Sequence, residues 1–277
     1  MKFRMTNFKT GSKADKMTYE TIRLDISDAI ATITLNRPER LNAMPPQMAD
    51  EIVAVLDHLE GARALLITGE GRAFCSGADL AARGTGAVIS RGQGAYGALT
   101  KSYNPMMLKL SKLPIPVVTA VNGPAAGIGC SLALASDFAI AGKSAYFLQA
   151  FVNIGLVPDG GASWMLARLV GKARATEMML LGEKISGEKA ADWGLIYKCV
   201  EDADLLTEAR GLALRLANGP TVALGIMRQN LAAALDADYA TALLREAEGQ
   251  QIAGNSGDAR EGATSFLQKR KAEFKGA

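Results

Sequence analysis

The chain turns twice through glycine, at Phe74-Cys75-Ser76-Gly77-Ala78-Asp79-Leu80 and at Asn122-Gly123-Pro124-Ala125-Ala126-Gly127-Ile128-Gly129. Each turn follows a short apolar run typical of a buried β-strand, at 64–68 and at 117–121. A strand that passes through glycine into the start of a helix leaves backbone N–H groups without intrahelical partners. Two such turns that face one point would form a pocket for a developing oxyanion, with no side chain needed as a donor.

Three further stretches accompany these turns. They are Leu35-Asn36-Arg37-Pro38-Glu39-Arg40-Leu41-Asn42-Ala43 before them, and Gly155-Leu156-Val157-Pro158-Asp159-Gly160-Gly161 and 260–270 after them. With the five motifs in this order, the chain resembles the crotonase (enoyl-CoA hydratase/isomerase) superfamily from about Tyr19 to the C-terminus. The resemblance implies an α/β fold, in which a ClpP-like spiral of ββα units precedes a C-terminal helical trimerisation region.

The composition is that of an ordinary globular protein. Of the 277 residues, 49% are hydrophobic and 21% are charged, which is enough apolar material for a sizeable core. The formal net charge of +3 is too small to indicate a nucleic-acid partner. The longest apolar region, 113–142, is interrupted by prolines and polar residues, so we expect no membrane span.

The cysteines indicate where the protein works. Cys75, Cys130 and Cys199 are odd in number and lie far apart in the sequence, which favours a reducing compartment without a disulfide framework. No apolar segment follows the basic N-terminal residues, so we expect no secretory signal. The simplest interpretation is a cytoplasmic protein.

The spacing of apolar residues predicts the elements. Strands are expected at 19–26 and 30–35, as a hairpin with Ser27-Asp28 near its turn, and at 63–68, 117–121, 138–140 and 145–147. Helices are expected at 48–59, 99–110, 127–136, 162–169, 173–181, 187–193, 205–217, 222–235, 239–252 and 258–271. We expect a disordered tail at 1–17 and a mobile loop at 81–98 that carries a flexible lid, 92–97. The acidic break at 201–204 divides a core, 18–204, from a helical oligomerisation region, 205–277.

The resemblance implies that the backbone N–H groups of Ser76 and Ile128 are the oxyanion donors. Polarising a thioester carbonyl acidifies the neighbouring C–H, and each preorganised donor contributes about 3–4 kcal/mol toward the transition state. The expected substrate and CoA contacts are Arg37, Arg40, Ser76, Gly77, Ala78, Asp79, Leu80, Gly127, Phe151 and Lys269, the last from a neighbouring subunit. The alternative for both turns is an ordinary connection between a strand and a helix, in which Asp79 fixes the first turn.

Two positions put hydration in doubt. Hydratases of this superfamily use two glutamates, and the corresponding positions here hold Ser131 and Phe151. A serine is no base near neutral pH without a partner, and a phenylalanine cannot accept a proton. Asp159 remains nearby, and it resembles the single acid with which isomerases of the superfamily move a proton between two carbons.

Asp159 has two interpretations. As a catalyst, it would gain basicity from an apolar wall of Phe151, Ile154 and Leu156. As a structural residue, it would cap the helix expected at 162–169. The resemblance favours catalysis.

Together these features predict an acyl-CoA isomerase. Tyr103-Asn104-Pro105 and Val157-Pro158-Asp159 are similar to the ring-opening isomerase branch of phenylacetate degradation, whose substrate is the CoA thioester of an epoxidised ring. A related reaction that the resemblance implies is the shift of a double bond in an enoyl-CoA. CoA would arrive with the substrate, and we expect no metal and no other cofactor. The alternatives are an enoyl-CoA hydratase, which is a lyase of fatty acid metabolism, and a non-catalytic relative that binds a CoA ester or RNA. The expected partners are an acyl-CoA and copies of the chain in a homotrimer or hexamer, without nucleic acid or membrane.

Overall fold

The structure is a computed structural model that describes residues 18–59, 61–80 and 90–277. The predicted tail, 1–17, and the first part of the predicted loop, 81–89, lie outside the described residues.

The described residues form interspersed strands and helices up to β9, and helices alone after it. The strands are β1 (Ile22–Ser27), β2 (Ile30–Leu35), β3 (Ala64–Gly69), β4 (Val117–Val121), β5 (Pro124–Ala126), β6 (Phe138–Gly142), β7 (Tyr146–Leu148), β8 (Ile185–Ser186) and β9 (Lys198–Val200). The helices are α1 (Pro46–Asp57), α2 (Arg91–Ala98), α3 (Asn104–Ser111), α4 (Ile128–Leu134), α5 (Ala162–Leu181), α6 (Gly187–Asp192), α7 (Leu205–Ala217), α8 (Thr221–Ala234), α9 (Tyr239–Gly254) and α10 (Gly257–Leu267).

The main sheet has the strand order β1-β2-β3-β4-β6-β9, and a smaller sheet has the order β5-β7-β8. Strands β1 and β2 are antiparallel, and the other pairs of the main sheet are parallel. Asp28 and Ala29 take positive φ angles of 53° and 57° between β1 and β2, as a tight hairpin turn requires. The predicted hairpin is therefore confirmed, and the mixed architecture is the predicted α/β class.

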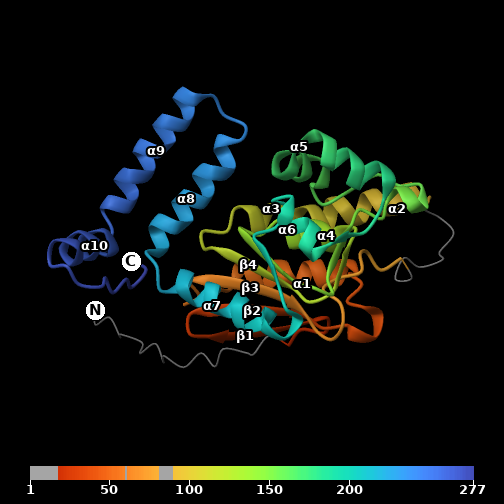
Figure 1. Cartoon of the computed structure of the whole chain (residues 1–277), viewed down its shortest axis with the longest axis horizontal. Helices are drawn as coiled ribbons and strands as arrows, with labels where there is room; N and C mark the ends of the chain where they lie inside the picture. The colour runs from red at the N-terminus through yellow and green to blue at the C-terminus, as the bar shows by residue number, and fades with distance from the viewer. Residues whose placement is uncertain (1–17, 60, 81–89) are drawn as a thin grey trace, which may run out of the picture.

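Helices cover both faces of the main sheet (Figure 1). In β3, Leu65 and Ile67 point to the face that packs against α1, α3 and α4, whereas Leu66 points to α7. This alternation is the period of two that a strand imposes. Helix α7 packs against this face with apolar residues that are spaced four apart: Leu205, Ala209, Ala213 and Ala217. The predicted boundary between a core, 18–204, and an oligomerisation region, 205–277, stays a prediction. Helix α7, which begins the second region, packs against the main sheet.

Helices α8 and α9 extend from this body as a long hairpin that leads to α10 (Figure 1). The middle of α8 is fixed to the body, because Arg228 forms an ion pair of 2.7 Å with Asp137 and donates to the main-chain oxygens of Leu110 and Leu113, both at 2.9 Å. These contacts hold the hairpin at a set angle to the body.

The prediction of a loop through 81–98 is wrong for its second half, because Arg91–Ala98 is helix α2. Ser90 and Gln93 form a capping box, in which each side chain bonds to the main chain of the other. Residues 92–97 are therefore helical rather than a loop, and their role as a lid stays a prediction. A π-helical turn, Leu99–Tyr103, joins α2 to α3. Pro105 follows it, and a proline has no N–H group to continue regular α-helical bonding.

Candidate active site

The first turn lies alongside the stretch Leu41 to Met44. The Ser76 N–H donates to the Leu41 oxygen at 3.0 Å, the Met44 N–H donates to the Gly77 oxygen at 2.8 Å, and the Asp79 N–H donates to the Met44 oxygen at 2.9 Å. The Ser76 amide is therefore already used. This corrects the prediction that the Ser76 N–H is an oxyanion donor.

The Ala78 amide takes the place of the Ser76 amide as the available group. Ala78 is the residue of this turn that stands opposite Met44 in a parallel bridge. In such a bridge the flanking residues bond to the partner, so the central residue directs its own N–H to the other side. Within the described part of the chain, the Ala78 N–H has no hydrogen-bond acceptor.

The second turn leads directly into α4. Gly127 precedes the helix with a φ of 53° and without a side-chain cap, and Ile128 is its first residue. The first N–H groups of a helix have no acceptor within it, so the Ile128 N–H is available, and its role as an oxyanion donor stays a prediction.

The two turns lie against each other. The Cys75 N–H donates to the Pro124 oxygen at 3.0 Å, and the Ala126 N–H donates to the Cys75 oxygen at 2.9 Å. A Cβ atom at Gly129 would lie only 2.8 Å from the Cys75 sulfur, so this position has room for glycine alone. The structure thus brings the Ala78 and Ile128 segments to one place, as the sequence predicted for the two turns.

Both buried cysteines beside the turns are packing residues. Complete burial raises the pKa of the Cys75 thiol to about 12 and that of the Cys130 thiol to about 12. Near neutral pH both are therefore protonated, and neither is a nucleophile.

Two side chains flank the first turn of α4 where hydratases carry glutamates. Phe151 is 8% exposed, and its ring lies 3.5 Å from the position of a Cβ at Gly127. Ser131 is fully buried, and its hydroxyl donates to the Asp159 main-chain oxygen at 2.9 Å. A Cβ at Gly160 would lie 2.8 Å from that of Ser131, so the Asp159–Gly160 turn sits directly on the helix.

The surroundings of Asp159 differ in part from the prediction. Helix α5 begins after Gly161, which is its N-cap residue, so Asp159 lies two positions before the N-cap, and its main-chain oxygen accepts the Ala162 N–H at 3.2 Å. Of the predicted apolar wall, only Phe151 is buried, because Ile154 and Leu156 are 56% and 45% exposed within one chain. The Oδ1 atom of Asp159 is nevertheless shielded from solvent.

Of the predicted CoA-binding residues, those of the N-terminal motifs lie near the first turn, and Lys269 lies far from it. Arg37 forms an ion pair of 2.8 Å with Asp79 and donates to the Ala43 oxygen at 2.6 Å, so it braces the first turn. Arg40 and Leu80 are exposed near this turn, and Leu80 is 53% exposed. Lys269 follows α10 at the far end of the molecule, so one chain does not bring it to the turns (Figure 1).

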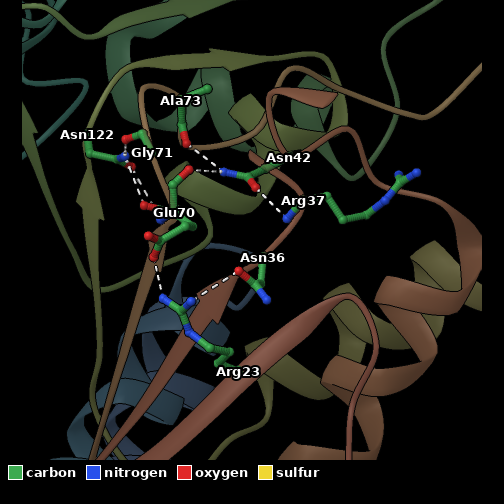
Figure 2. A network of polar contacts seen from close by, with 9 residues as sticks. Arg23, Asn36, Arg37, Asn42, Glu70, Gly71, Ala73 and Asn122 are labelled. Atoms are coloured by element: carbon green, nitrogen blue, oxygen red, sulfur yellow. Dashed lines mark hydrogen bonds and ion pairs between the residues drawn. The ribbon is translucent and has the colours of Figure 1, made fainter. Parts of the chain in front are cut away.

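Sequence reasoning missed two asparagines that hold the segment after β3. The Asn122 amide nitrogen donates to the Gly69 and Gly71 oxygens at 2.9 and 2.8 Å. Asn42 reaches the same segment from the other side, and Arg23 pairs with the Glu70 carboxylate beneath it (Figure 2). Asn42 lies in the motif 35–43 and Asn122 in the motif 122–129, and this placement could have indicated their role.

Two further properties bear on function. Among residues 18–59, 61–80 and 90–277, no group of three His, Cys, Asp or Glu residues is placed to hold a metal ion. Each helix of the described chain is too short or too polar to cross a lipid bilayer.

Comparisons with known proteins give one consistent result. The model of a family described as enoyl-CoA hydratase/isomerase matches residues 25–277. A Rhodobacter capsulatus protein named "Probable enoyl-CoA hydratase" is 46% identical over 94% of this chain and 100% of its own length. The Escherichia coli K12 protein "1,2-epoxyphenylacetyl-CoA isomerase" is 42% identical over 93% of this chain and 99% of its own. The crystal structure of an enoyl-CoA hydratase from Bacillus anthracis is similar with a TM-score of 0.87 and 29% identity, over 93% of this chain and 100% of that one.

Proposed function

Since the chain belongs to the enoyl-CoA hydratase/isomerase family and has its crotonase fold, we propose that it is an isomerase that moves a proton within the acyl group of a CoA thioester. One observation carries the proposal. The two positions that hold glutamates in hydratases of the family hold Ser131 and Phe151 here, and Phe151 covers Gly127 beside the second turn. Adding water needs a base for the water and an acid for the carbon, whereas isomerisation needs one group for both transfers.

In the proposed reaction, the thioester oxygen lies between the N–H groups of Ala78 and Ile128. Removing a proton next to the carbonyl turns the thioester into an enolate, whose negative charge rests on that oxygen. Backbone donors fixed before the reaction stabilise this charge without reorganising, at about 3–4 kcal/mol each. Because the requirement is for main chain, Ile128 serves as well as a glycine would.

Asp159 is the proposed proton carrier. Its carboxylate takes a proton from one carbon of the acyl group and returns it to another, so the carboxylate is regenerated and no water is consumed. The contact between the Ser131 hydroxyl and the Asp159 main-chain oxygen supports this role, because it fixes the turn of Asp159 beside Ile128.

The proposed substrate class is the CoA thioester of an epoxidised ring, which is rearranged to an oxepin. The similarity to 1,2-epoxyphenylacetyl-CoA isomerase supports this class over a linear enoyl chain. A second candidate is hydration of a 2-enoyl-CoA, which the name of the Rhodobacter capsulatus relative favours. A relative that only binds a CoA ester or RNA has no comparable support.

Self-association in a homotrimer or hexamer belongs to the same proposal. Large apolar side chains on the α8–α10 arm are exposed in the single chain: Met227, Leu231, Leu244, Phe266 and Leu267. Clusters of exposed apolar side chains mark interaction surfaces. We further propose a cytoplasmic location and a reaction that uses no cofactor beyond the CoA of the substrate.

The test compares two reactions at equal enzyme concentration. Crotonyl-CoA is mixed with the protein while the enoyl absorbance is followed, and ring-epoxide and β,γ-enoyl CoA esters are offered in parallel with product analysis by mass and NMR. We expect rearranged isomers of unchanged mass and little loss of the crotonyl-CoA signal. Rapid addition of water to crotonyl-CoA at ordinary enzyme levels contradicts the proposal.

A further inference from the structure

We propose that Asn42 is a positioning residue, whose side-chain amide sets the register that leaves the Ala78 N–H available to a thioester oxygen. This inference rests on the proposed function, because it concerns the same N–H group. Asn42 reaches the site only through the main chain, since its side chain bonds to main-chain atoms of Arg37, Glu70 and Ala73.

Asn42 lies at the centre of a small polar network (Figure 2). Its side chain is fully buried, and the Nδ2 atom donates to the Ala73 oxygen at 2.7 Å and to the Glu70 oxygen at 3.0 Å. The Oδ1 atom accepts the Arg37 N–H at 2.8 Å. The amide therefore uses both donor hydrogens and its oxygen, and it joins the main chain at Arg37 to the main chain of 70–73.

The backbone at this position also suits asparagine. Leu41 and Asn42 have φ angles of 52° and 54°, in the left-handed region. Asparagine adopts this region readily, whereas leucine does so only where its surroundings hold it there. The reversal directs the Leu41 oxygen at the Ser76 N–H, 3.0 Å away. Asn42 thus holds the chain in the conformation that occupies the Ser76 amide.

The bonds that follow depend on this register. Past Asn42, the Met44 N–H bonds to Gly77 and the Met44 oxygen accepts the Asp79 N–H. Successive main-chain amides of an extended segment point to opposite sides, so a shift of one residue would exchange the amides that are bonded for those that are available. The Ala78 N–H would then face Met44 instead of the second turn.

Asn42 fixes the chain just before the first turn, and Arg37 fixes it near the end of that turn. Asn42 holds Ala73, which immediately precedes the turn that begins at Phe74. Arg37 holds Asp79 near the end of the same turn through the ion pair of 2.8 Å. Fixing both ends fixes the position of Ala78 between them.

The test uses two variants that both tolerate a left-handed backbone. Asn42→Asp keeps the shape of the side chain but turns an oxygen toward the Glu70 and Ala73 oxygens, and Asn42→Gly removes the side chain. The matched control is Asn230→Asp, since Asn230 also donates to a main-chain oxygen, that of Arg245, but lies on the distant helix α8. Circular dichroism and thermal melting establish that each variant is folded.

The readout is the carbonyl stretch of phenylacetyl-CoA labelled with 13C at the thioester carbon, which reports polarisation of the bound carbonyl without turnover. We expect the wild-type protein and Asn230→Asp to lower this frequency on binding, and both Asn42 variants to lose at least about half of the shift. With the isomerised substrate, kcat should fall by about 100-fold while KM changes by less than about threefold.

Three other outcomes would contradict the positioning role of Asn42 or the proposed function. A full shift and full kcat in folded Asn42 variants overturn the positioning role. If neither variant folds, Asn42 holds the fold rather than the pocket, and the inference is wrong. A wild-type protein that binds the ester without any shift contradicts the proposed function itself, and this inference with it.

Discussion

The hydroxyl of Ser131 donates a hydrogen bond of 2.9 Å to the main-chain oxygen of Asp159. A residue at the position of a hydratase glutamate therefore supports the turn of the remaining acid. Ser131 is buried on α4, three residues after Ile128, so the same helix turn carries a proposed oxyanion donor and holds the proposed proton carrier. The hydrogen bond from Ser131 to Asp159 thus links the position where hydratases carry a glutamate to the placement of the Asp159 turn.

Replacing Asp159 by Asn should abolish isomerisation and leave binding intact. The amide keeps the size of the carboxylate but accepts no proton, so kcat should fall by about 10²- to 10⁴-fold. Isothermal titration with an unreactive acyl-CoA should give a Kd within about threefold of the wild-type value. Asp236→Asn, on the surface near Arg168, is the control and should turn over normally. Unchanged turnover in Asp159→Asn would assign Asp159 a structural role.

Two Gly→Ala changes should have opposite effects on stability. At Gly129 the new methyl group would meet the Cys75 sulfur at 2.8 Å, so we expect a loss of about 1–3 kcal/mol in the free energy of unfolding, or a failure to fold. At Gly211, inside α7, a Cβ meets nothing within 4 Å, so Gly211→Ala should gain about 1 kcal/mol from helix propensity. Urea titration of both variants measures the difference. Equal stabilities would show that the two turns do not pack as described.

The fold could be predicted where burial follows a clear period. The hairpin and α7 were expected because apolar residues recur every second or every fourth position. Strands β5, β8 and β9 have two or three residues each, which is too short for any period to show. Helix α2 was missed because Gly92, Gly94 and Gly97 lower helix propensity, although Ser90 and Gln93 carry the capping signal.

The site was predictable to the level of the two turns but not of each amide. The availability of the Ile128 N–H follows from local chain geometry, because any first helical residue lacks an intrahelical acceptor. Whether Ser76 or Ala78 offers its N–H depends on the pairing with Leu41 and Met44, which is a contact between distant parts of the sequence. Only the three-dimensional structure contains that register.

Lowering the pH should loosen the C-terminal segment through Glu261. Hydrogen bonds from the Arg270 guanidinium and from the Glu273 N–H lower the pKa of Glu261 from 4.5 to about 2. A carboxyl whose folded pKa is depressed contributes stability above its unfolded pKa, and this contribution is lost as the pH falls from about 4.5 through about 2. Carbon NMR of the carboxyl group measures the midpoint, and Arg270→Gln should return it toward 4.5. A midpoint near 4.5 in the wild-type protein would contradict the contact.

Replacing Gln149 by Met should stabilise the protein. Gln149 is fully buried directly after β7, and the partner that the described part of the chain offers to its side-chain amide is the Cys130 thiol. The Cys130 thiol beside it is only a weak donor and acceptor. Because burying an amide whose hydrogen bonds are poorly satisfied costs about 1–3 kcal/mol, a methionine of similar shape should raise the free energy of unfolding by about 1 kcal/mol.

Urea unfolding checks this, with Gln47→Met as the control. The Gln47 amide donates to Glu20 and Glu51 at the exposed start of α1, so its loss should change stability by less than about 0.5 kcal/mol. A loss of more than about 1 kcal/mol in Gln149→Met would contradict the prediction, because it would mean that an ordered water satisfies the amide. In that case Gln149 would belong to the polar support of α4, immediately behind the residues that present the Ile128 N–H.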